Sequence, residues 1–140
     1  MPVEDAASLD RSILEQTPDA VIYADTAGTI ARWNGAAATL FGYSAADALG
    51  QRLDLIIPEH LQKAHWSGFD KAVASGLTRL QGRPTLTRAK HKSGRKLYVE
   101  ITFALVKHAG GVVQGAVAVA RDVTERIEQQ RARDQTQRAD

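Results

Sequence analysis

The sequence predicts an α+β domain, because segments with strand character and segments with helical character are grouped apart along the chain. After an opening helix, two short strands are expected first, then three helices, and then three long strands that lead into a final helix. The alternating βαβ order that builds parallel sheets is absent. The expected strands are 20–24, 29–33, 79–90, 96–107 and 112–120, and the expected helices are 6–16, 35–41, 45–49, 59–75 and 125–140.

The first helix and the hairpin after it are predicted by local signals. Leu9, Ile13 and Leu14 fall on one side of a helix. The residue before Pro18 disfavours the helical conformation, so the helix is expected to end there. The turn 25–28 ends in glycine and separates two short apolar runs, which is the pattern of a β-hairpin.

The middle helices have recognisable ends. Asn34 is suited to cap the helix 35–41, and Gly42 is suited to end it. Pro58 is favourable in the first turn of the helix 59–75, and Gly76 is expected to close that helix.

The long strands are predicted by alternation of apolar and polar residues. The clearest example is the strand 96–107, and its alternating apolar residues are Leu97, Val99, Ile101, Phe103 and Leu105. Turns are expected at 92–94 and 108–111. The polar helix 125–140 would be marginal alone in water, so we interpret it as the first turns of a longer coiled-coil linker.

The composition of the chain excludes several classes of functional site. The chain has 140 residues, a net charge of +2 and no cysteine, so disulfides, thiolate metal sites and cysteine nucleophiles are excluded. Its basic residues are not concentrated in one segment, which gives nucleic-acid binding little support. No apolar run approaches the roughly 20 residues that span a bilayer, so we expect a cytoplasmic chain without a membrane segment.

Enzymatic activity is not predicted for this chain. The sequence has no nucleophile elbow, no phosphate-binding loop, no dinucleotide fingerprint and no zinc-protease motif. Its carboxylates sit singly at positions of surface character, with no paired arrangement that spacing reveals. A binding or sensory module is therefore expected rather than a catalyst.

Two segments resemble the PAS family of sensory domains. The first half of the family is matched by PDAVIYADTAGTIARWNGAAATLFGYS, and the second by KSGRKLYVEITFALVKHAGGVVQGAVAVARDVTER. The resemblance implies the PAS fold: a five-stranded antiparallel sheet with short helices and one longer helix over one face. It implies an N-terminal flanking helix at residues 1–17 and the sensor domain at 18–124. Residues 125–140 would be the first part of a C-terminal signalling helix.

The junction between the last strand and the final helix is a candidate signal relay. Asp122 can accept backbone N–H groups at the start of the helix, and Thr124 can do likewise. Such a cap would tie the helix to the sheet, so that strain in the sheet is felt by the helix. The alternative is ordinary helix capping without a signalling role.

His65 is the most informative single residue. On the helix 59–75 it falls on the apolar stripe between Leu61 and Phe69, whereas His60 points elsewhere. A neutral imidazole that faces an apolar cavity is what haem iron needs as a proximal ligand, and Gly68 would leave room for a macrocycle. The alternative is a hydrogen-bonded core histidine. Trp66, the next residue, is expected to face the other way and to serve a dimer contact.

The same segment is similar to the haem-binding PAS domains of bacterial oxygen sensors. That resemblance implies haem b, with His65 as the iron ligand and with Lys71 and Arg79 near the propionates. It places Leu80, Ile101 and Phe103 on the distal wall. The sequence departs from these sensors where they carry an arginine that binds oxygen, because Thr85 stands there, with Arg83 just before it.

The function implied is sensing of a diatomic gas, oxygen first among them, or of redox state. The signal would pass to a C-terminal output domain, a kinase of a two-component system or a cyclic-nucleotide enzyme, in a homodimeric parent protein. The alternative is a haem-free PAS module that binds a small organic ligand or mediates dimerisation. In that case His65 and Arg83 would be polar groups of a pocket.

Overall fold

The computed structural model describes residues 5–78 and 82–139 and contains one five-stranded antiparallel sheet in the order β2-β1-β5-β4-β3. The α+β architecture predicted from the sequence is confirmed. The strands are β1 (Ala20–Asp25), β2 (Ile30–Trp33), β3 (Thr85–Lys90), β4 (Lys96–Lys107) and β5 (Val113–Asp122). The helices are α1 (Ala6–Gln16), α2 (Gly35–Phe41), α3 (Ala45–Ala48), the 3₁₀ turn η1 (Leu53–Leu55), α4 (Glu59–Ser75) and α5 (Thr124–Ala139).

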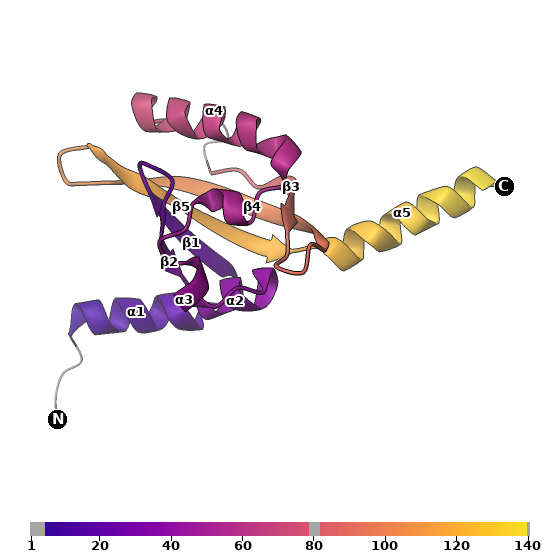
Figure 1. Ribbon diagram of the computed structural model, residues 1–140, viewed down its shortest axis with the longest axis horizontal. Helices are drawn as coiled ribbons and strands as arrows, with labels where there is room; N and C mark the ends of the chain where they lie inside the picture. The colour runs from indigo at the N-terminus through magenta and orange to yellow at the C-terminus, as the bar shows by residue number, and fades with distance from the viewer. Residues whose placement is uncertain (1–4, 79–81, 140) are drawn as a thin grey trace.

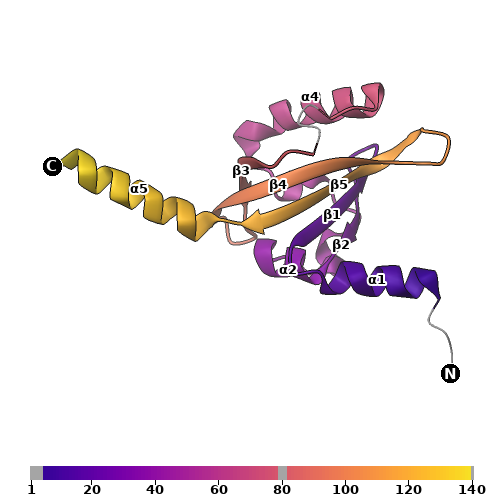
Figure 2. The same cartoon turned by 180° about the vertical axis from the view of Figure 1, so that it is seen from behind.

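The helices surround the sheet unevenly. In the view of Figure 1, α4 lies at the top of the molecule and α1 at the bottom, near α2 and α3. The reverse view shows α5 projecting from the end of β5 without covering the sheet (Figure 2). Within the described part of the chain, no helix is long and apolar enough to cross a membrane.

The expected helix ends are confirmed at the residues that signalled them. The Asn34 side chain accepts a hydrogen bond from the backbone N–H of Ala37 at the start of α2, and Gly42 ends that helix in the left-handed conformation. Pro58 precedes the first residue of α4, and Gly76 closes it, again left-handed. A helix end depends on the residues directly around it, so the local sequence alone is sufficient to predict it.

The strand expected at 79–90 is too long at its start. Residues 79–81 lie outside the described residues, and 82–84 are not in a strand, because β3 begins at Thr85. Gly82 has a φ of 80°, which strand backbone does not adopt, and Pro84 has no N–H to offer a neighbouring strand.

Asn34 also connects three elements through its buried carboxamide. Its Oδ1 accepts the backbone N–H of Val21 on β1 at 2.9 Å, in addition to that of Ala37 at 3.0 Å. Its Nδ2 donates to the carbonyls of Leu14 on α1 at 2.9 Å and of Asp19 at 3.0 Å. Asn34 is 1% exposed, so α1, β1 and α2 are joined by hydrogen bonds that are shielded from solvent.

The hydrophobic core lies between the sheet and α2, α3 and η1, and α4 covers the rest of the same face. Buried residues from the central strands include Ile22, Val99 and Ile101, and they pack with Trp33 and Phe41. This core leaves a hollow beneath α4.

Candidate functional site

A cavity of about 460 Å³ lies between α4 and the inner face of the sheet. Its size is within the range of pockets that hold a cofactor or a drug-sized ligand. Most of its lining is apolar. From the helices and their connections the lining residues are Phe41, Leu53, Ile56, Ile57, Leu61, Ala64, His65 and Phe69; from the strands they are Ile22, Ala24, Thr85, Leu86, Thr87, Arg88, Ala89, Val99, Ile101, Phe103, Ala116, Val117 and Ala118.

Small side chains on the central strands make room for the cavity. Ala24 on β1 is paired with Ala116 on β5, and Ala118 on β5 is paired with Phe103 on β4. All of these residues line the hollow. The sequence signal was the alternation of alanine along β5, which marks a strand face that leaves space.

His65 contributes the imidazole expected from the helical stripe. Its ring lines the cavity, and its Nδ1 is buried without a hydrogen-bond partner. Burial lowers the pKa of His65 below the ordinary value, although the negative charges of Asp54 and Asp70 act in the opposite direction. The imidazole is therefore held in the neutral form, in which a ring nitrogen carries a lone pair that can bind a metal.

An aromatic cluster encloses the His65 ring on α4. The ring centroids of His65 and Trp66 are 4.8 Å apart with an interplanar angle of 75°. The Phe69 ring lies 5.9 Å from that of His65 and 5.4 Å from that of Trp66. These are edge and tilted contacts of the kind that aromatic rings prefer.

Trp66 does not have the exposed orientation expected from the sequence. Its ring packs against the backbone of Gly28 in the β1–β2 turn, so closely that a Cβ at Gly28 would overlap it. Its Nε1–H donates to Asp54 Oδ1 at 2.7 Å, and the Arg52 guanidinium lies 4.2 Å from the ring centre. The expectation that Trp66 faces away from the rest of the domain is wrong, because these neighbours come from segments that a helical pattern does not include. The expected dimer contact stays a prediction.

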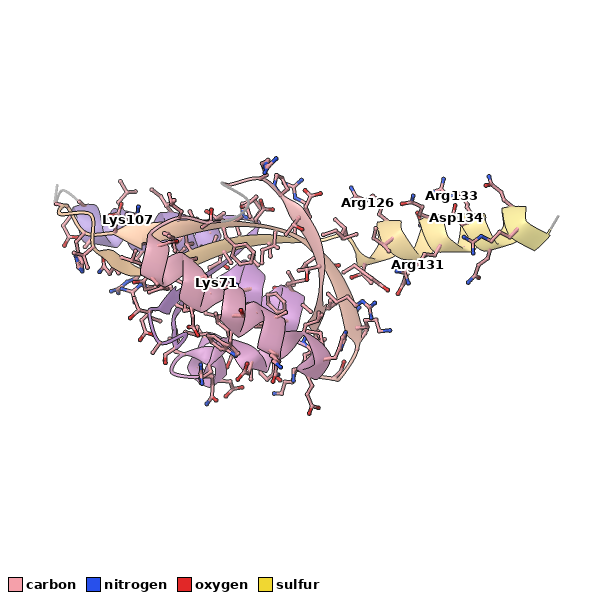
Figure 3. All side chains as sticks on the ribbon, turned by 90° about the horizontal axis from the view of Figure 1, so that it is seen from above. Lys71, Lys107, Arg126, Arg131, Arg133 and Asp134 are labelled. Carbon is pink, nitrogen blue, oxygen red and sulfur yellow. The ribbon has the colours of Figure 1, made fainter. Side chains whose placement is uncertain are left out.

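The other predicted cofactor residues are divided between the cavity and the surface. Ile101, Phe103 and Thr85 line the cavity. Lys71 is exposed on α4 (Figure 3), and Arg83 is exposed before β3; neither lines the cavity.

Three further positions complete the comparison with the sequence. Arg79 and Leu80 lie outside the described residues. Gly68 is exposed, and the space beside it is not part of the cavity, so the expectation that Gly68 makes room for a macrocycle is wrong.

The exit from the sheet is held by Asp122 and Thr124. The Asp122 Oδ1 accepts the Thr124 backbone N–H at 2.9 Å and its hydroxyl at 2.6 Å. The Thr124 Oγ1 in turn accepts the backbone N–H of Tyr98 on β4 at 2.9 Å. Thr124 therefore joins α5 to the neighbouring strand, which is a firmer link than a helix cap alone.

Two arginines extend this attachment along α5. The Arg131 guanidinium lies 4.9 Å from the centre of the Tyr98 ring, and Arg126 forms an ion pair of 3.8 Å with Glu100. Figure 3 shows Arg126 in the first turns of α5 and Arg131 further along. The Arg126–Glu100 pair is exposed and contributes little to stability. The connection therefore depends mainly on Thr124 and on the backbone bond from the Val123 N–H to the Tyr98 carbonyl at 2.9 Å.

The family model for the PAS fold matches residues 14–128, and the chain belongs to this family. Among curated proteins it is 32% identical over 123 residues to an uncharacterised protein of Azorhizobium caulinodans, covering 87% of this chain and 16% of that protein. It is 28% identical over 100 residues to the sensor protein FixL of Bradyrhizobium diazoefficiens, covering 71% and 20%. It is 25% identical over 111 residues to the oxygen sensor protein DosP of Escherichia coli, covering 79% and 14%.

Solved structures agree with the fold. A PAS domain from Colwellia psychrerythraea superimposes with a TM-score of 0.74 at 24% identity, covering 86% of this chain and 99% of that one. An RNA-binding light-oxygen-voltage receptor superimposes with a TM-score of 0.72 at 23% identity, covering 97% and 40%. The chain spans a fifth or less of the curated relatives that it matches. PAS domains are generally sensory modules of signalling proteins, and this chain is one.

Proposed function

We propose that this domain binds haem b through His65 and senses a diatomic gas, with oxygen as the first candidate, or the redox state of the haem. The observation that carries the proposal is the neutral His65 imidazole, whose Nδ1 is buried without a hydrogen-bond partner, at a mostly apolar cavity of about 460 Å³. A buried polar atom without a partner costs free energy. Coordination to a metal is one way to satisfy the ring.

The residues present fit a haem in chemistry and in polarity. His65 would hold the iron, and the apolar side chains of Ile101 and Phe103 would contact the macrocycle and exclude water. Lys71, the residue expected near a propionate, is exposed on α4 and does not line the cavity. When bound, the haem would supply an iron that takes up a diatomic gas or changes oxidation state; Thr85 would supply a hydroxyl within the cavity.

A haem titration tests this function. We expect the purified chain to give a Soret band on addition of haemin and His65→Ala to give none, while the matched variant His60→Ala keeps it. His60 is exposed on the same helix, so its removal controls for the loss of a surface histidine. Haem uptake by His65→Ala equal to that of the unsubstituted chain, with both folded by circular dichroism, would contradict the proposal.

The second candidate is a haem-free pocket for a small, mostly apolar organic ligand. It is favoured by one observation: the predicted propionate partner Lys71 does not line the cavity. Flavin has less support, because the described lining residues include no asparagine or glutamine to meet the polar edge of its ring system. A preparation that takes up no haemin but is stabilised by small apolar alcohols or acids would favour this candidate.

We extend the proposal to the role of the chain in a longer protein. Its relatives are five or more times as long as the matched segment, and two of them are named as sensor proteins. We propose that α5 passes the signal through Asp122 and Thr124 to a C-terminal output domain, a two-component kinase or a cyclic-nucleotide enzyme. The parent protein would act as a cytoplasmic homodimer.

A further inference from the structure

We infer that Trp66 is a positioning residue for His65: it fastens α4 to the β1–β2 turn and η1, and so fixes the imidazole at the cavity wall. The inference deepens the proposed function and rests on it where haem is concerned. Its first observation is the place of Trp66, next to His65 in sequence, with the two ring centroids 4.8 Å apart in an edge contact.

The partners of Trp66 belong to one rigid unit. The Leu53 N–H donates to the Gly28 carbonyl at 3.1 Å, and Thr29 forms a bridge with Arg52. The β1–β2 turn and the segment that leads into η1 are therefore tied together by backbone hydrogen bonds before Trp66 reaches them. A side chain fixed to this unit is fixed to the sheet.

Each contact of Trp66 restrains it in a different direction. Gly28, with a φ of 82°, brings bare backbone against the ring, and any other residue would displace the indole. Arg52 lies over the ring face. The bond from Nε1–H to the Asp54 carboxylate fixes the rotation of the ring in its plane, and a charged acceptor makes such a bond strong.

The rest of α4 has few attachments that could replace this one. Backbone hydrogen bonds hold the strands to one another, but α4 has none with the sheet among those of the described residues. Among the described residues, the hydrogen bond of the Gln62 side chain goes to the nearby Ile57 carbonyl and not to the sheet. Loss of the Trp66 anchor would let α4 tilt and the His65 ring sample more than one orientation.

Three variants separate positioning from general stability. Trp66→Phe keeps an aromatic ring and removes the N–H donor. Asp54→Ala removes the acceptor and leaves α4 unchanged, so it tests the same bond if Trp66→Phe folds poorly. Trp33→Phe is the matched control, because the Trp33 Nε1–H donates to the Tyr43 carbonyl at 2.9 Å in the core, and Trp33 does not line the cavity.

The first measurement uses the haem-free chain with ¹⁵N-labelled histidine, well above pH 7 so that the His65 ring is neutral. We expect one set of His65 ring signals in the unsubstituted chain and in Trp33→Phe, and broadened or doubled signals in Trp66→Phe and Asp54→Ala. Because no haem is involved, this measurement tests the position of the ring even if haem uptake fails and the proposed function falls.

The second measurement follows haem transfer from the loaded chain to apomyoglobin. We expect transfer about ten-fold faster for Trp66→Phe and Asp54→Ala, the size of effect that loss of one hydrogen bond to a charged group can give. Trp33→Phe should leave the rate unchanged. A single set of His65 signals in both Trp66→Phe and Asp54→Ala, or equal effects from Trp33→Phe, would overturn the inference.

Discussion

At the scale of single residues, His65 combines an unpaired ring nitrogen with burial beside a cavity. Its Nδ1 is buried and unpartnered, whereas buried polar atoms in native proteins nearly always have a hydrogen-bond partner. The neighbouring negative charges of Asp54 and Asp70 would favour a charged ring, but desolvation outweighs them and the pKa falls. A site that holds an imidazole neutral and accessible from a cavity is prepared for a ligand.

This depressed pKa predicts how stability depends on pH. The unfolded chain binds a proton at His65 near the ordinary value of about 6.5, whereas the folded chain stays neutral to lower pH because its pKa is lowered. Between the two pKa values the unfolded state binds more protons, so stability falls as pH decreases below about 6.5 and the loss ends near the folded pKa.

Urea unfolding of the haem-free chain at pH 7.5 and at pH 5.5 measures this effect. We expect the drop in unfolding free energy to be smaller in His65→Gln than in the unsubstituted chain. His60→Gln, on the exposed side of the same helix, should show the full drop. An undiminished drop in His65→Gln would show that the imidazole is not held neutral by burial.

The direction of His65 was predictable from the sequence, but the surroundings of Trp66 were not. Leu61, His65 and Phe69 lie four residues apart, so helical periodicity alone places them on one face. The same reasoning turned Trp66 outward, because a helical wheel contains only its own helix. Gly28 and Asp54 reach Trp66 through tertiary packing, and no spacing in the sequence encodes that meeting.

At the scale of elements, Asn34 determines how the first helix and the first strand meet. Four of its hydrogen bonds reach α1, the segment that leads into β1, β1 itself and α2. The sequence revealed the cap on α2, which is a local pattern. It did not reveal the bonds to Leu14, Asp19 and Val21, because these residues are 13 or more positions away.

Removal of this side chain should cost far more than removal of an ordinary cap. We expect Asn34→Ala to lower the unfolding free energy by about 3 kcal/mol or more, since it removes a helix cap and leaves several buried backbone groups unpaired. Ser44→Ala, which removes the exposed cap of α3, should cost about 1 kcal/mol. Chemical denaturation measures both, and equal losses would mean that Asn34 acts only as a cap.

The strand whose start differed most from its prediction shows the limit of local patterns. The expected strand 79–90 ignored Gly82 and Pro84 because the residues around them have strand character. Backbone geometry prevails over that tendency: a left-handed glycine and a residue without an N–H delay β3 until Thr85. By contrast, β4 was predicted over its full length, because one alternating pattern extends from Lys96 to Lys107.

At the scale of the whole molecule, one strand, β5, both lines the cavity and leads into α5. The first and last strands are neighbours in the centre of the sheet, so β5 carries Ala116 and Ala118 on the cavity wall and ends at Asp122 beside α5. A displacement of β5 against β4 would act directly on the bond between Tyr98 and Thr124. No long path through the protein is required.

This arrangement predicts that haem loading changes the mobility of α5, and that Thr124 is needed for the change. Because the chain has no cysteine, Gln130→Cys provides a unique site for a spin label on α5. We expect its electron paramagnetic resonance spectrum to change on haem loading. In the Thr124→Val background the haem should still bind, but the spectral change should be lost, because valine accepts no bond from Tyr98 and gives none to Asp122.

The matched control lies on the same helix. The Thr136 hydroxyl donates to the Ala132 carbonyl at 3.0 Å within α5, so Thr136→Val removes a threonine hydroxyl without touching the sheet. It should leave the haem response intact. A coupling between sites requires two states that the ligand distinguishes. If the Thr124→Val variant responds to haem as the unsubstituted chain does, the signal leaves the sheet by another route. The Thr124 bond then only holds α5 in place.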